Sequence, residues 1–136
     1  MATRLSTQAA NDVADGGLDT LFNGAFLDVY TGAQPADPNA APTGTLLGTI
    51  DLSADWLTTA VNGVKSKNGT WSGLAIANGT AGWARFRRGS DSGGLSTVDT
   101  RIDVAVGAEI IFDNPIVSIA QELVVTAYTF TLPRGV

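Results

Sequence analysis

The chain has 136 residues, of which 44% are hydrophobic and only 15% charged, and its net charge at pH 7 is −5. This length and composition predict one folded domain and argue against intrinsic disorder. The absence of cysteine and histidine excludes disulfides, thiolate chemistry and the commonest general base near neutral pH.

The N-terminal segment predicts one short helix, from about residue 6 to residue 22. Apolar residues recur there at helical spacing, and Asn23-Gly24 is a suitable stop. Gly16-Gly17 weakens the helix, because each glycine costs about 1 kcal/mol relative to alanine. A weak isolated helix needs a partner surface, so we expect Leu18 and Phe22 to contact a neighbouring subunit.

From residue 25 onward the sequence predicts β-structure. Apolar and polar residues alternate clearly over 45–52 and 122–132, and Asn-Gly pairs at 62–63, 68–69 and 78–79 suit tight hairpin turns. We therefore expect a mainly β fold, a single-domain antiparallel β-sandwich or barrel with one short N-terminal helix. The expected strands are 25–31, 45–52, 61–67, 70–77, 82–88, 95–106, 108–112 and 122–132.

A proline-rich loop at residues 32–44 interrupts the predicted strands. It holds three prolines and two glycines, and long loops of this kind are often functional or ordered by a partner. The chain is thus divided into an N-terminal helical segment, residues 1–24, and a β-sandwich core, residues 25–136, that carries this loop. We expect both the N-terminal segment and the loop to contact neighbouring subunits.

Groups suited to catalysis are sparse. The two lysines alternate along one expected strand, and the DSGG sequence at residues 91–94 has no partner histidine to activate a nucleophile. Asp99 and Asp103 flank Arg101 on one expected strand face, which favours a ladder of charges over a catalytic carboxylate pair. We therefore expect no enzyme, no catalytic residue, no bound metal and no cofactor.

The stretch GTAGWARFRRGSD, residues 79–91, contains three of the eight basic residues of the chain. In a strand, Trp83, Arg85 and Arg87 share one face while Phe86 points to the core. Tryptophan beside guanidinium groups is typical of an interface, and a solvated edge strand is the alternative. A pI near 4.3 argues against nucleic-acid binding. We therefore expect these three residues to contact a protein.

Several segments together resemble a group of small structural proteins of tailed-bacteriophage virions. These segments are MATRLST, TGAQPADPNAAPTGTLLGTI, NGTAGWARF and VTAYTFTLP, so the similarity spans nearly the whole chain. Its most specific parts, TGAQP…TGTLL and GTAGWARF, contain no catalytic residue that could be carried over. The run at residues 87–115 departs from the pattern of the group, being more charged and bulkier.

The resemblance implies a virion component that is assembled in the host cytoplasm. We favour a capsid decoration or cement protein on the capsid surface, a homo-oligomer that contacts the major capsid protein or other virion proteins and binds neither nucleic acid nor membrane. A neck or tail component is one alternative. Another is a carbohydrate-binding virion module, in which tryptophans form a stacking platform, although some of these are expected in the core: Trp56, Trp71 and Trp83.

Overall fold

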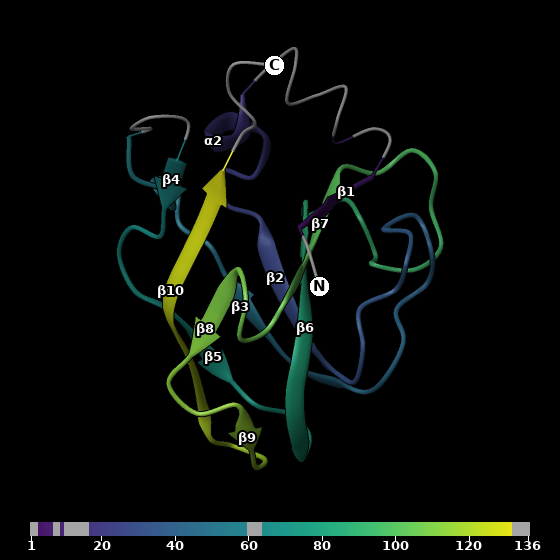
Figure 1. Cartoon of the computed structure of the whole chain (residues 1–136), viewed down its shortest axis with the longest axis vertical. Helices are drawn as coiled ribbons and strands as arrows, with labels where there is room; N and C mark the ends of the chain where they lie inside the picture. Colours follow the sequence, from purple (N-terminus) through teal and green to yellow (C-terminus); the bar gives the residue numbers. More distant parts are fainter. Residues whose placement is uncertain (1–2, 7–8, 10–16, 60–63, 132–136) are drawn as a thin grey trace.

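The computed structural model describes residues 3–6, 9, 17–59 and 64–131, and these residues form a mainly β structure (Figure 1). The mainly β class expected from the alternation of apolar and polar residues is thus confirmed. The elements are β1 (Arg4–Leu5), α2 (Leu18–Leu21), β2 (Phe26–Thr31), β3 (Leu46–Asp51), β4 (Val64–Ser66), β5 (Trp71–Leu74), β6 (Gly79–Arg87), β7 (Arg101–Ala105), β8 (Ile110–Phe112), β9 (Ile116–Val117) and β10 (Glu122–Thr131).

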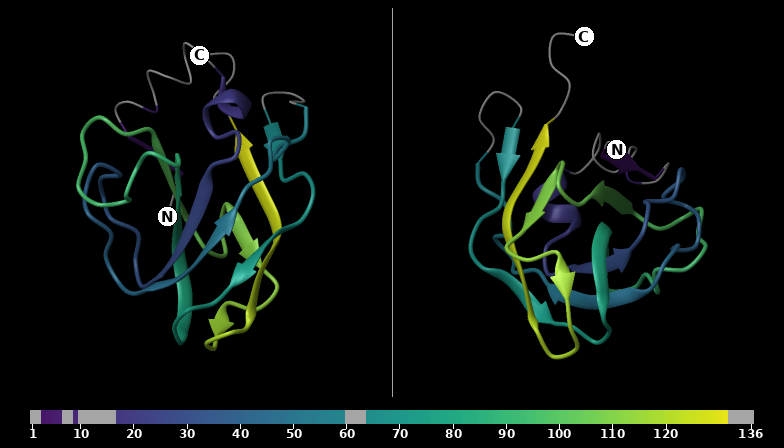
Figure 2. Two further views of the ribbon diagram at one scale, coloured as in Figure 1. Left: turned by 180° about the vertical axis from the view of Figure 1, so that it is seen from behind. Right: turned by 60° about the horizontal axis from the view of Figure 1, so that its bottom comes forward.

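The strands form two antiparallel sheets that enclose one core (Figure 2). A six-stranded sheet has the order β1-β7-β6-β2-β3, with β9 also paired to β6; a four-stranded sheet has the order β4-β10-β5, with β8 also paired to β10. Single bridges, Gly48 with Ala75 and Val106 with Ile110, link the two sheets at two seams. The arrangement is compatible with a β-sandwich, and the described strands do not close into a barrel.

Five aromatic side chains form the centre of the core. Their ring centroids lie 4.9–6.5 Å apart, mostly in tilted or edge-to-face pairs. Such pairs add about 0.5–1.5 kcal/mol each to the free energy gained by burying large rings. The cluster joins both sheets and the segment before β2, and its members are Phe22, Trp56, Trp71, Phe86 and Tyr128.

The expected single helix over residues 6–22 is not seen, because the helix is interrupted at Gly17 within the described residues. Among the described residues of this range, Ala9 and the four-residue helix α2 are helical while Ser6 and Gly17 are not. Arg4 and Leu5 pair with β7 as strand β1. The other residues of the expected helix lie outside the described part of the chain.

The sequence led us to expect that Leu18 and Phe22 contact a neighbouring subunit. The structure places both side chains elsewhere. Both are buried in the core of this chain. The Phe22 ring packs edge-on against Trp56 at 5.8 Å and against Phe86 at 6.2 Å. Burial against these rings stabilises the segment within the chain itself.

A bulge in β6 brings the start of the proline-rich loop close to the sheet. The register with β2 shifts after Tyr30, so Gly82 has no partner residue on β2. A Cβ atom at Gly82 would lie 1.9 Å from the carbonyl oxygen of Gly32. Glycine is therefore required at this position for the loop to leave β2 where it does.

We expect Gly82→Ala to lower the free energy of unfolding by about 2 kcal/mol or more, because the loop backbone must move to admit the methyl group. Urea denaturation followed by tryptophan fluorescence measures the change. Gly89→Ala is the matched control, since a Cβ there makes only an ordinary 3.5 Å contact with the Phe26 ring, and its effect should stay within about 0.5 kcal/mol. Equal losses in both variants would contradict this view of the bulge.

Candidate functional site

The face of the six-stranded sheet that points away from the core carries charged residues in register. Asp28 on β2, Arg85 on β6 and Asp103 on β7 lie directly opposite one another and form a row across three strands. In the next row, Arg87 lies opposite Arg101. Side chains alternate between the two faces of a strand, so these charges share one face.

Two of the arginines form buried bidentate ion pairs. Arg85 donates from Nε and Nη2 to the two carboxylate oxygens of Asp103, at 2.8 and 3.0 Å. Arg101 donates in the same way to Asp91, at 2.6 and 2.7 Å. Charged groups without access to water need such pairing, because an isolated buried charge costs several kcal/mol.

A third pair completes a neutral cluster of three guanidinium groups and three carboxylates. Arg87 Nε donates to Asp28 Oδ2 at 2.6 Å, and this pair lies nearer the solvent than the other two. The Arg87 guanidinium also lies 4.8 Å from the centre of the Phe26 ring. We call the six residues of the three pairs the arginine layer: Asp28, Arg85, Arg87, Asp91, Arg101 and Asp103.

The guanidinium groups use their remaining N–H donors to hold two loops. Arg85 Nη1 donates to the carbonyl oxygens of Ala40 and Gly93, both at 2.9 Å. Arg101 Nη1 donates to the carbonyl oxygen of Pro38 at 3.1 Å. Hydrogen bonds from charged donors are roughly twice as strong as neutral ones, so the arginine layer fixes the conformation of both loops.

The two loops lie side by side over the arginine layer, on one flank of the molecule (Figures 1 and 2). We call them together the loop lobe, residues 32–44 and 88–100. The backbone N–H of Ser96 donates to the carbonyl oxygen of Asn39 at 2.9 Å and so joins one loop to the other. The two loops of the lobe are thus in contact with each other and together cover this part of the sheet.

Trp83 and Arg85 are both 0% exposed, so the expectation that they form an outward interface together with Arg87 is wrong. Trp83 stacks on Tyr30 with ring centroids 4.6 Å apart, and its indole N–H donates to the carbonyl oxygen of Thr43. The faces of β6 were assigned correctly from the alternation, with Ala84 and Phe86 in the core. The loop lobe, which covers the second face, was not foreseen.

The tryptophans offer no stacking platform for a sugar. Trp56 and Trp71 lie in the aromatic cluster between the sheets, and Trp83 lies beneath the loop lobe. All three are buried, whereas a stacking platform needs an accessible ring face. The residues that motivated a carbohydrate-binding module therefore have structural roles.

The roles of Asp28, Asp91 and Asp103 as partners of these arginines were not predicted. The expected charge ladder placed Asp103 beside Arg101, whereas Arg101 pairs with Asp91 and Asp103 pairs with Arg85. A signal for two of them is present, because Asp28 and Asp103 stand within the apolar strand sequences FLDVY and RIDVA. A charged residue inside a strand of a chain this poor in charge indicates a partner on a neighbouring strand. Asp91 lies in a loop, where no comparable pattern marks it.

The pKa values of the two most buried aspartates shift in opposite directions. Burial alone would raise the pKa of Asp91, but hydrogen bonds from the Arg101 guanidinium and the Gly93 backbone N–H outweigh it and hold the value below normal. For Asp103, burial dominates and raises the pKa above its ordinary value despite the pairing with Arg85.

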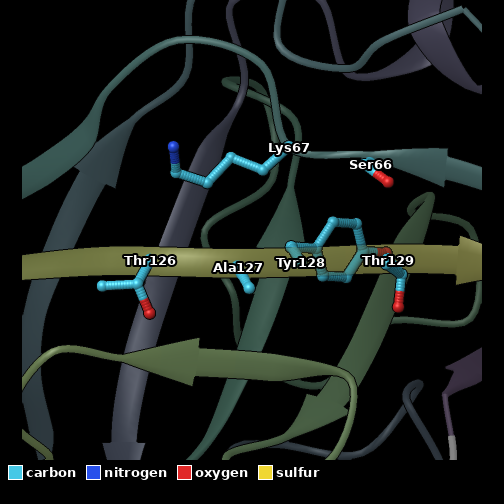
Figure 3. Close-up of a pocket in the computed structure, with 6 residues that line it drawn as sticks. All are labelled: Ser66, Lys67, Thr126, Ala127, Tyr128 and Thr129. Atoms are coloured by element: carbon cyan, nitrogen blue, oxygen red, sulfur yellow. The ribbon is translucent and has the colours of Figure 1, made fainter.

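A shallow depression of about 190 Å³ lies on the other sheet, between β4 and β10 (Figure 3). On the other side of β10, the register with β8 shifts between Val125 and Ala127. The Lys67 ammonium donates to the carbonyl oxygen of Gly69, and the Thr126 hydroxyl to that of Ile111. Two of its polar groups are thus used within the chain. The lining residues are Ser66, Lys67, Thr126, Ala127, Tyr128 and Thr129.

No protein-family model matches the chain, and comparisons with curated proteins and with solved structures found no match. Within the described residues, no group of three or more acidic, histidine or cysteine side chains is placed to hold a metal ion. Among the helices of that same part of the chain, none has both the length and the apolar character needed to cross a membrane.

We expect Arg85→Leu to lower the free energy of unfolding by about 3–5 kcal/mol, because it leaves the buried Asp103 carboxylate without a partner. Chemical denaturation measures the loss. The control is Arg88→Leu, at an exposed position on the same stretch, for which we expect a change within about 0.5 kcal/mol. An Arg85→Leu protein as stable as the wild type would show that the pair contributes nothing to the fold.

The opposite pKa shifts of Asp91 and Asp103 predict opposite pH dependences. The pKa of Asp91 is lowered from 3.8 in the folded state, so its contribution to stability is present above that value and lost as the pH falls. The stability difference between wild type and Asp91→Asn should therefore shrink on acidification. The pKa of Asp103 is raised, so the wild type should gain stability relative to Asp103→Asn as the pH falls. Denaturation curves over a pH series measure the stability difference between wild type and each variant. If this difference changes with pH in the same direction for both variants, the opposite pKa shifts are contradicted.

Proposed function

We propose that this chain is a non-enzymatic structural protein of a tailed-bacteriophage virion, a capsid decoration protein that stabilises the head by protein–protein contacts. The observation that carries the proposal is the packing of the two segments on which the resemblance rests. Residues 31–47 fold over residues 79–86, and the Trp83 indole and the Arg85 guanidinium donate to carbonyl oxygens of the loop. The two segments thus form one structural unit.

The loop lobe is suited to bind a partner because it is held in place before binding. Charge-assisted hydrogen bonds from the arginine layer fix both loops, so little conformational entropy is lost when a partner covers them. The charges of the layer compensate one another and are occupied within the chain, which suits a scaffold rather than a reaction centre.

Two large apolar side chains stand out on the surface of the loop lobe. Leu95 is 78% exposed and Val98 is 74% exposed. Apolar side chains on a fixed loop lose little entropy on contact and gain free energy when a partner removes them from water. In the proposed function, these two residues contact the major capsid protein. Many copies bound across a symmetric shell reinforce a contact that is weak in each copy.

We expect Leu95→Asp combined with Val98→Asp to reduce the occupancy of this protein on particles by at least tenfold. The variant would be supplied to particles assembled without the chain, and occupancy measured by quantitative mass spectrometry and particle reconstruction. Ser53→Asp combined with Thr59→Asp is the matched control, because it adds the same charge at exposed positions outside the lobe. It should bind like the wild type.

The same reconstruction separates the placements. Density for this chain on the capsid lattice is the expected result. Density confined to the neck or tail would move the protein to the alternative position, and particles that never incorporate it would refute the virion function.

A further inference from the structure

A second surface, away from the loop lobe, has a different chemistry. It lies at the end of the molecule where β9 meets the start of β6 (Figure 1). Two eight-residue segments form it, residues 74–81 and 114–121, and neither contains a charged residue. We call them the uncharged end.

Hydrogen bonds hold the two segments of the uncharged end together. The backbone N–H of Ala75 donates to the carbonyl oxygen of Gln121, and that of Ala120 donates to the carbonyl oxygen of Ala75, both at 2.9 Å. The backbone N–H of Ile119 donates to the side-chain oxygen of Asn78 at 2.8 Å. The segments therefore present one continuous surface.

This surface carries four of the seven exposed large hydrophobic side chains of the described residues. Their exposed fractions are 62–68%. Single exposed apolar residues are ordinary on a soluble protein, but several on two short paired segments mark an interaction surface. The four are Leu74, Ile76, Ile116 and Ile119.

The turn that carries Ile119 is strained. Its closing hydrogen bond runs from the Gln121 N–H to the carbonyl oxygen of Ser118. Ala120, the third residue of the turn, has φ 69° and is the one non-glycine residue with positive φ in the described part of the chain. Turns of this kind favour glycine there. Strain of this sort is kept where a surface needs a particular shape, here a turn that holds Ile119 outward.

The outer edge of β9 is closed to strand addition. The backbone N–H of Ile116 donates to the side-chain oxygen of Asn114 at 3.1 Å, and the carbonyl oxygen of Ile116 accepts from the Gln121 side chain at 3.3 Å. Both backbone groups that could pair with another strand are thus occupied. A partner must bind through the apolar side chains.

We propose that the uncharged end is the surface through which two copies of this chain associate. Each copy has a net charge of −5, so two copies repel each other where acidic surfaces meet. At the uncharged end this repulsion is weakest and apolar side chains are available. Asp113 and Glu122 flank the segment 114–121 and are exposed, so they can remain in water at the rim of the contact.

The size of the uncharged end limits how strongly two copies can associate. Standard stable interfaces use roughly 20–30 residues on each side, more than the two short segments supply. We therefore expect reversible association that varies with concentration. The inference supplies the contact for the homo-oligomer that the resemblance to virion proteins led us to expect. It is tested in solution without particles, so it and the proposed function can fail separately.

The test is sedimentation equilibrium of the full chain over a wide concentration range. We expect the wild type to self-associate, and more strongly in high salt because salt screens the repulsion between acidic copies. Ile116→Asp combined with Ile119→Asp should raise the dissociation constant at least tenfold. Leu95→Asp combined with Val98→Asp removes the same kind of side chain from the loop lobe and should leave association unchanged.

Three results would overturn the proposal: a wild type that stays monomeric throughout, an end variant that associates as well as the wild type, or equal weakening by the lobe variant. Circular dichroism checks that each variant is folded. If the double variant does not fold, Ile119→Asp alone decides, because this residue is mostly exposed at a turn. Ala120→Gly relieves the strained φ and should retain association.

Discussion

Two buried arginine–aspartate pairs hold the loop lobe on the six-stranded sheet, and the conformation of much of the outer structure depends on them. A guanidinium has five N–H donors, and a bidentate pair uses only two, so the others need acceptors. Carbonyl oxygens of Pro38, Ala40 and Gly93 supply these acceptors. Without the loops, the remaining N–H donors of the arginines would lack acceptors. Without the arginines, the loop carbonyl oxygens would lack donors. Pairs and loops therefore require each other.

This dependence explains why β6 is buried on both faces although its sequence alternates. Ala84 and Phe86 pack into the core, while Trp83 and Arg85 lie under the lobe. The Arg85 guanidinium lies 5.2 Å from the centre of the Trp83 ring, a cation–π contact that gains strength where water is excluded. In this strand the polar face contacts a second layer of the protein and not solvent.

The alternation of a strand could be predicted from the sequence, but the contacts of its polar face could not. Alternation located β2, β3 and β10 within a residue of their ends, because each pairs along a length with a clear apolar face. The two-residue strands β1 and β9 have no such pattern and exist only through tertiary pairing. The ion pairs were not predicted for a related reason. Their charges are visible in the strand sequences, but which charge meets which depends on a register that one sequence does not reveal.

The distribution of charge has a consequence for the surface. The chain is poor in charged residues, and the arginine layer uses six of them in ion pairs within the chain, five beneath the loop lobe and Asp91 in the lobe itself. The outer surface is therefore poorer still in charged side chains, although its net charge is unchanged because the layer is neutral. Most of the exposed large apolar side chains of the described residues lie on the uncharged end or the lobe. Surfaces of this composition gain free energy when they are covered. Internal ion pairing thus places charge beneath the loops and leaves apolar side chains as the main feature of the uncharged end.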